Sequence, residues 1–228
     1  MSTVARSAHK RRCHLSVSTE WGRFPSDAGF GYLAHVDADI SMWGEYGPRP
    51  EPNHDLDALF GSMSATAEVE VSCSPEAAWD LISSIERIGE FSPECIEAWW
   101  TPDRPARAVG GRFEGRNRVV RGEHVAEWVR PCDVTAWDPG QQLAWSVGDR
   151  YDGTPSSRWS FTIAPRPGGV LLRQEFQHEP DGLSGLRHRA EAHPAEAEQT
   201  VAERTVGLGQ GMAATLARMK VVLETDPR

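Results

Sequence analysis

Lysine is almost absent from this chain. Of its 24 basic residues only Lys10 and Lys220 are lysines, and the 33 acidic residues leave a formal net charge of -9. Binding to nucleic acid depends on clustered Lys and Arg side chains that neutralise phosphates. An acidic chain without a basic face therefore predicts no nucleic-acid partner.

Long hydrophobic runs are also missing. No stretch approaches the roughly 20 apolar residues that a membrane-spanning helix needs. The basic N-terminal residues Arg6, Lys10 and Arg11 are not followed by the apolar core of a signal peptide, because polar residues such as His14 and Glu20 interrupt it. We therefore expect a cytoplasmic protein without stable membrane insertion.

Cysteine is sparse, and no two cysteines lie close together in the sequence. The four are Cys13, Cys73, Cys95 and Cys132. This scatter predicts neither a zinc ribbon nor a disulfide framework. His188 and His193 are five residues apart and Pro194 follows, whereas histidines that share a metal on one helical face are three or four apart. We expect no metal and no cofactor.

The N-terminal quarter of the chain lacks a lasting apolar period. The whole chain, with 39% apolar and 25% charged residues, has a globular composition, and 228 residues allow one domain plus an extension. Residues 1–62 are interpreted as an irregular or disordered extension outside the core, because the stretch 46–54 is rich in proline. Met63 stands just before the first patterned strand. Either translation begins at Met63, or the upstream residues are a genuine disordered tail.

From Met63 onward the apolar pattern is regular. Residues 66–72 alternate like a half-buried strand, and Ser74 and Pro75 then provide an N-cap and a first-turn proline for a short helix. A second short helical turn ends near Gly89. Six further strands are predicted at 95–100, 111–119, 123–136, 143–147, 158–163 and 170–178. Pro131 within the longest of them indicates a bulge or a sheet edge.

The C-terminal third changes to a helical period. An apolar stripe steps by three or four residues through Leu208, Met212, Leu216, Met219 and Leu223. Pro194 is expected at the start of this helix or at a kink before it. The glycines in 207–211 are expected to allow a close approach to the sheet or to a ligand. The predicted fold class is α+β, a curved antiparallel sheet of seven strands wrapped around the long C-terminal helix.

Several of these segments resemble a known family. In order and spacing they are similar to the START/Bet v 1-like superfamily (SRPBCC), specifically its bacterial polyketide cyclase/dehydrase-like branch. The segments are 67–82, 91–94, 110–118, 133–140, 143–147 and 208–224. The resemblance covers most of a domain at residues 63–226. It implies a helix-grip fold with an elongated cavity between sheet and helix.

The resemblance implies more than one kind of function. Some members are aromatases or cyclases that act on polyketides, and others carry lipids or hormones, so the fold does not decide the chemistry. We expect binding of a small hydrophobic or aromatic ligand, lipid- or polyketide-like, by a monomer or homodimer. The alternative is a polyketide cyclase, aromatase or dehydratase that uses the same cavity. A third class is an interaction module that uses the convex face of the sheet.

The strand phases and the helical stripe predict which residues line the cavity. Asn117 and Gln174 are the expected polar contacts, although a turn or cross-strand role would also suit Asn117. His178 is a candidate general acid or base, and the alternative is a half-solvated residue at the strand end. The expected apolar lining is Trp145, Trp159, Phe161, Phe176 and Met212. Core packing under the helix is the alternative for these side chains.

Overall fold

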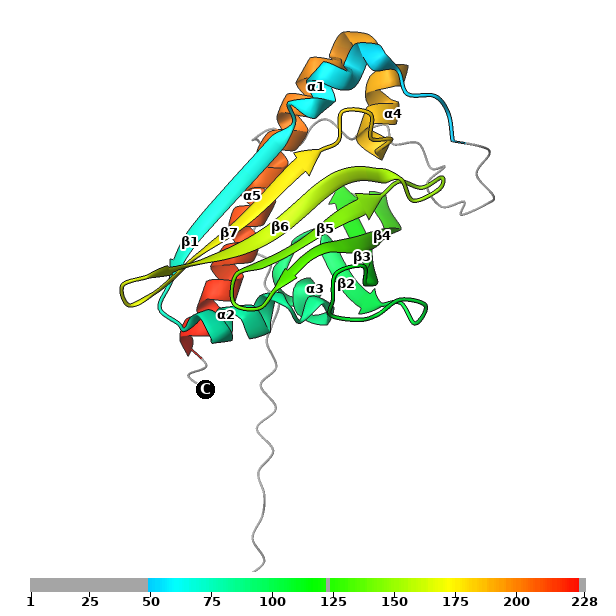
Figure 1. Ribbon diagram of the computed structural model, residues 1–228. Coiled ribbons are helices and arrows are strands. Elements are labelled where there is room, and N and C mark those ends of the chain that lie inside the picture. Colours follow the sequence, from blue (N-terminus) through cyan, green and yellow to red (C-terminus); the bar gives the residue numbers. More distant parts are fainter. Residues whose placement is uncertain (1–48, 122–123, 226–228) are drawn as a thin grey trace, which may run out of the picture.

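A curled antiparallel sheet wraps around a long C-terminal helix in the computed structural model, which describes residues 49–121 and 124–225 (Figure 1). In this part of the chain the sheet has seven strands, in the spatial order β1-β7-β6-β5-β4-β3-β2. The strands are β1 Ser64–Val71, β2 Cys95–Trp100, β3 Arg112–Arg121, β4 His124–Asp138, β5 Gln142–Gly148, β6 Pro155–Arg166 and β7 Gly169–His178. The predicted α+β helix-grip fold is confirmed.

The helices lie at the ends of the sheet and along one side of it. The α-helices are α1 Asp57–Gly61, α2 Pro75–Ile82, α3 Ile88–Phe91, α4 Gly185–Ala192 and α5 Ala197–Thr225. Short 3-10 turns are η3 His54–Leu56, η4 Ile85–Arg87 and η5 Pro194–Glu196. The predicted N-cap is present, since the Ser74 hydroxyl accepts a hydrogen bond from the Ala77 backbone N–H. No helix in the described ranges is long and apolar enough to cross a membrane.

The irregularity expected at Pro131 lies elsewhere. Pro131 pairs with Glu114 in an unbroken ladder between β3 and β4, and the register shifts instead between Val134 and Ala136, against β5. Of the two predicted alternatives the bulge at Pro131 is therefore wrong, whereas the edge is confirmed locally, because β5 provides no partner for Pro131. Proline is tolerated there because the ladder with β5 begins only at Cys132, so its missing N–H removes no bond on that side.

Helix α5 covers only one side of the concave face. It packs mainly along β1 and also contacts β7, and Figure 1 shows it running behind these two strands. Its predicted stripe is confirmed, because Leu208, Met212, Leu216 and Met219 are buried. Apolar side chains form two clusters, one around α2 and α3 and one between α1, β7, α4 and the first half of α5. At the α2 end, the apolar side chains of β3 to β6 pack in one cluster with α2, α3 and the second half of α5.

The residues just before β1 belong to the core. Phe60 of α1 is 0% exposed and shares an apolar cluster with Met63, Phe176 and Met212. The prediction that residues 1–62 contribute nothing to the core is therefore wrong for residues 49–62. Residues 1–48 lie outside the described residues, so their irregular character stays a prediction, as does a start at Met63.

The glycines of α5 do not bring the helix close to the sheet or to any other described element. A Cβ atom at Gly207 or Gly209 would meet nothing within 4 Å, and one at Gly211 would lie 3.5 Å from Pro93, an ordinary contact. Their expected close approach to the sheet is therefore wrong, whereas a close approach to a ligand stays a prediction. What remains is the cost in backbone entropy of glycine inside a helix.

Replacing Gly207 or Gly209 by alanine should stabilise the protein. Each change should raise the free energy of unfolding by about 0.5–1 kcal/mol, because the methyl group fits and the unfolded chain loses freedom. Urea denaturation measures the gain. Gly182→Ala is the control and should destabilise, since its Cβ would lie 2.5 Å from the Ser156 carbonyl oxygen. Lower stability of both helix variants would contradict this account.

Candidate ligand-binding site

Aromatic rings line the concave face of the sheet in a continuous row. Across β7, β6 and β5, Phe176 lies opposite Trp159, and Trp159 lies opposite Trp145. The ring centroids of Phe176 and Trp159 are 4.9 Å apart, and the rings of Trp159 and Trp145 are stacked within 5° at 6.4 Å. Phe161 joins them at 5.8 Å from Trp145. Strand register thus brings four of the predicted residues together.

The row continues across the rest of the sheet. Phe113 of β3 lies 5.8 Å from Trp145, and Trp100 of β2 lies 5.7 Å from Phe113. Trp137 of β4 contacts Trp100 at 5.9 Å and Trp79 of α2 at 5.2 Å. We call this set the aromatic wall; it comprises Trp79, Trp100, Phe113, Trp137, Trp145, Trp159, Phe161 and Phe176. Four of its members were not among the predicted site residues, because strand phase alone does not place strands far apart in the sequence beside one another.

Part of the aromatic wall remains accessible. Trp100, Trp137, Trp145 and Trp159 are only half-buried, because α5 packs against β1 and β7 rather than over these rings. At the end formed by Phe176, Met212 of α5 is 2% exposed and packs in the same cluster. Met212 therefore closes one end of the wall. Half-buried aromatic side chains on a concave face are typical of sites for apolar ligands.

Gln174 is the polar group buried beside the wall. It is 6% exposed and lies on β7 between Ala67 and Phe161 of the neighbouring strands. Its side-chain oxygen is buried and has no hydrogen-bond partner in the described part of the chain, and the same holds for the indole nitrogen of Trp100. A buried polar group without a partner costs about 1–3 kcal/mol. One acceptor and one donor are thus available to a bound molecule.

Asn117 is not part of this group. It lies on β3, four strands from Gln174 in the sheet, opposite Trp128 of β4 and Cys95 of β2. Its amide nitrogen donates to the Gly115 carbonyl oxygen at 3.3 Å. The structure therefore separates the two polar contacts that the sequence predicted for one ligand, and Asn117 makes a local contact within its strand.

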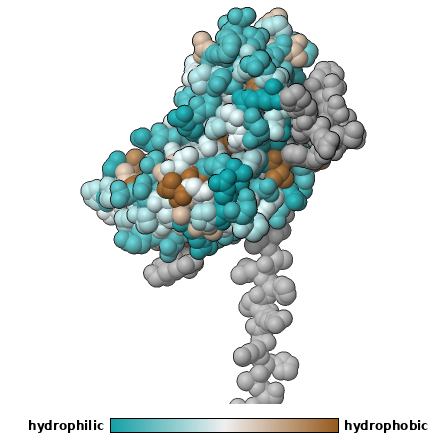
Figure 2. All heavy atoms as spheres, turned by 45° about the vertical axis from the view of Figure 1, so that its right-hand side comes forward, coloured by the Kyte–Doolittle hydropathy of each residue, from teal (hydrophilic) through white to brown (hydrophobic). Residues whose placement is uncertain are grey.

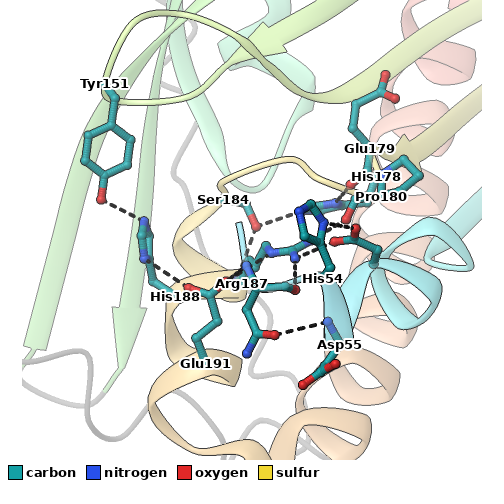
Figure 3. Close-up of polar contacts among 12 residues, drawn as sticks. His54, Asp55, Tyr151, His178, Glu179, Pro180, Ser184, Arg187, His188 and Glu191 are labelled. Atoms are coloured by element: carbon teal, nitrogen blue, oxygen red, sulfur yellow. Dashed lines mark hydrogen bonds and ion pairs between the residues drawn. The ribbon is translucent and has the colours of Figure 1, made fainter. Parts of the chain in front are cut away.

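His178 is held on both ring nitrogens (Figure 3). Nδ1 lies 2.6 Å from the Glu179 carbonyl oxygen, and Nε2 lies 2.7 Å from the hydroxyl of Ser184, the N-cap of α4. A carbonyl can only accept, so Nδ1 carries the proton and Nε2 accepts from Ser184. Burial lowers the pKa of His178 to about 4. With both nitrogens engaged, this histidine joins β7 to α4 and is not a free acid or base.

The predicted alternative for His178, a half-solvated side chain at the strand end, is wrong. Its ring is 2% exposed and lies 4.7 Å from the ring of Phe60. The sequence reasoning missed this burial because the covering residues come from α1 and α4, which had not been predicted.

The protein should become less stable as the pH is lowered and His178 becomes protonated. Its folded pKa of about 4 lies below the unfolded value of 6.5, so its contribution is complete above pH 6.5 and is lost as the pH falls toward 4. Between pH 7 and pH 4.5 the loss should be roughly 2–3 kcal/mol. Urea denaturation of the wild type and of His178→Asn at both pH values isolates this contribution from the carboxylates. The same pH dependence in both proteins would contradict the assignment.

The other reactive side chains near the wall are poorly suited to chemistry. Burial raises the pKa of the Cys95 thiol to about 11 and that of the Cys132 thiol well above its usual range. Both thiols are therefore protonated and weakly nucleophilic near neutral pH. In the described ranges no three His, Cys, Asp or Glu side chains are grouped so that they could hold a metal ion.

A polar hollow of about 520 Å³ opens on the opposite face of the sheet. Its lining includes Ser146 and Arg158, which alternate along their strands with Trp145 and Trp159. Arg158 is ion-paired with Glu179, another residue of the lining. The hollow lacks aromatic side chains, so it does not suit the ligand that the wall would hold.

The chain matches the sequence profile of a protein family over residues 62–224. The family is described as polyketide cyclase / dehydrase and lipid transport. Because the match spans well over half of the chain, this protein belongs to that family. A comparison with curated proteins gives no match.

Solved structures of similar proteins show the same fold. A polyketide-cyclase-like protein of Corynebacterium glutamicum is 24% identical, with 71% of this chain and 91% of that chain aligned at a TM-score of 0.50. StfQ, a di-domain ARO/CYC of the steffimycin pathway, is 12% identical over 71% of this chain and 50% of its own, also at 0.50. BexL, a di-domain ARO/CYC of the BE-7585A pathway, is 16% identical over 72% of this chain and 50% of its own, with a TM-score of 0.50. At these identities the likeness concerns the fold.

Proposed function

We propose that the protein binds a small apolar or aromatic molecule, lipid- or polyketide-like, against the aromatic wall. The observation that carries this proposal is the row of half-buried rings on the concave face, with the buried, unpartnered amide oxygen of Gln174 beside it. Aromatic side chains offer a large apolar contact area, and a single polar group fixes the orientation of a ligand. The ligand accordingly has a flat or flexible apolar body and at least one hydrogen-bonding group.

Binding accounts for these residues better than catalysis does. A cyclase, aromatase or dehydratase needs an acid or base that can reach the ligand. His178 has both nitrogens engaged, and the Cys95 and Cys132 thiols are protonated at neutral pH. The family description includes both chemical conversion and transport. The wall, as described, supports holding or carrying the molecule.

A role as an interaction module through an apolar surface has less support. The large hydrophobic side chains that are strongly exposed in the described ranges are all valines: Val109, Val120, Val125, Val206 and Val221. Only Val120 and Val125 are paired with each other, across β3 and β4. On the face shown in Figure 2, hydrophobic residues form small patches among hydrophilic ones. One pair and a few single exposed apolar residues are normal for a protein surface.

The proposed role of Gln174 gives opposite effects on stability and binding. Gln174→Met should raise the free energy of unfolding by about 1 kcal/mol, because it removes a buried amide oxygen without a partner. The same change should lower the affinity for 2-naphthol, whose hydroxyl can donate to the amide oxygen, by about three- to tenfold. Naphthalene, which lacks the hydroxyl, should keep its affinity. Urea denaturation and isothermal titration calorimetry measure the two effects.

Gln142→Met is the matched control for this experiment. Gln142 is half-buried on β5 and alternates with Leu143, so it faces away from the wall. Its substitution should leave both ligands unaffected. Failure of the wild type to bind either compound would overturn the proposed function. An equal loss of affinity for 2-naphthol in both variants would show that Gln174 is not part of the site.

A further inference from the structure

The segment before β1 is held in place by a buried guanidinium. Arg187 of α4 is 0% exposed, and it donates to the carbonyl oxygens of Asn53 and Pro180 and to the carboxylates of Asp57 and Glu191 (Figure 3). The contacts with the carboxylates are 2.6 Å and 3.1 Å long. Two of these four partners precede β1, so α4 fixes the position of residues 53–57.

Further polar contacts join the same end of the molecule to the turn between β5 and β6. Arg49 pairs with the buried carboxylate of Asp149 at 2.6 Å. The hydroxyl of Tyr151 in that turn lies 2.9 Å from Nε2 of His188 in α4. The segment before β1, the β5–β6 turn and α4 therefore form one connected cap.

Phe60 is the apolar part of this cap. Its ring contacts the guanidinium of Arg187, 5.4 Å from the ring centre, and the imidazole of His178, 4.7 Å away. His178 and Phe176 point to the same face of β7, and Phe176 is the last ring of the aromatic wall. Phe60 and Phe176 also belong to one apolar cluster. Phe60 thus stands where the wall ends.

We propose that Phe60 forms the end of the ligand site and sets the length of molecule that the wall accepts. This inference rests on the proposed function, because it concerns the same site. Phe60 lies before residue 62, where the family match begins. The size limit would therefore be a property of this chain, contributed by a segment that the family profile does not include.

Two phenols of different length test the proposal on the full chain. The probes are 2-naphthol, with two fused rings, and 2-hydroxyanthracene, with three in line, and titration calorimetry gives both dissociation constants. In Phe60→Ala the affinity for the three-ring phenol should rise about tenfold relative to the two-ring phenol, because the vacated space buries a further ring. Phe60→Leu keeps more of the apolar volume and should shift this ratio of affinities in the same direction by a smaller factor. It provides the test if the alanine variant does not fold.

Phe91→Ala is the matched control. Phe91 is 2% exposed and belongs to the cluster around α2 and α3, which also holds Phe113 and Phe161 of the wall but not Phe60 or Phe176. In the described part of the chain its ring makes no close ring contact with the wall. Its substitution should lower stability and leave the ratio of affinities unchanged. An unchanged ratio in Phe60→Leu and Phe60→Ala, or an equal shift in Phe91→Ala, would overturn the role of Phe60 while the proposed function stands. If the wild type binds neither phenol, the proposed function fails, and this inference fails with it.

Discussion

A sheet of seven strands is wider than the single helix that packs on it. Six strand spacings of about 4.8 Å make the sheet roughly 29 Å wide, whereas a helix with its side chains is about 10 Å across. Helix α5 therefore covers β1 and β7, and the concave side of the other strands is occupied by large aromatic side chains. Trp145 and Trp159 are only half-buried by neighbouring side chains, so part of their apolar surface stays accessible. The proposed binding face follows from this mismatch in width.

Charge, rather than apolar packing alone, determines how the end of this face near Phe176 is closed. A guanidinium buried like that of Arg187 is costly unless opposite charges and hydrogen bonds compensate it. The carboxylates of Asp57 and Glu191 and two carbonyl oxygens supply that compensation. Because Asp57 precedes β1, the compensation also positions Phe60, and a segment outside the family match becomes part of the domain.

Local patterns in the sequence were enough for the fold and for part of the site. Period-two alternation gave the phase of five of the seven strands, and this phase placed Trp145, Trp159 and Phe176 on one face. Phase says which face a residue occupies but not how far around the sheet it lies, so Asn117 was grouped with Gln174 although three strands lie between them. Helix α1 is only a little longer than one turn and shows no recognisable period, and the burial of Phe60 depends on Arg187, far along the chain.

The indole signals of the nine tryptophans offer the most direct view of the proposed binding face. In a two-dimensional ¹H–¹⁵N spectrum each indole N–H gives its own peak, and single Trp→Phe variants assign them. Trp99 serves as the reference, because it alternates with Trp100 along β2 and packs against Arg116 rather than against the wall. On titration with 2-naphthol, the peaks of Trp100, Trp145 and Trp159 should shift together with one dissociation constant, while that of Trp99 stays in place. Shifts confined to Trp99, or no shifts at all, would contradict binding at the aromatic wall.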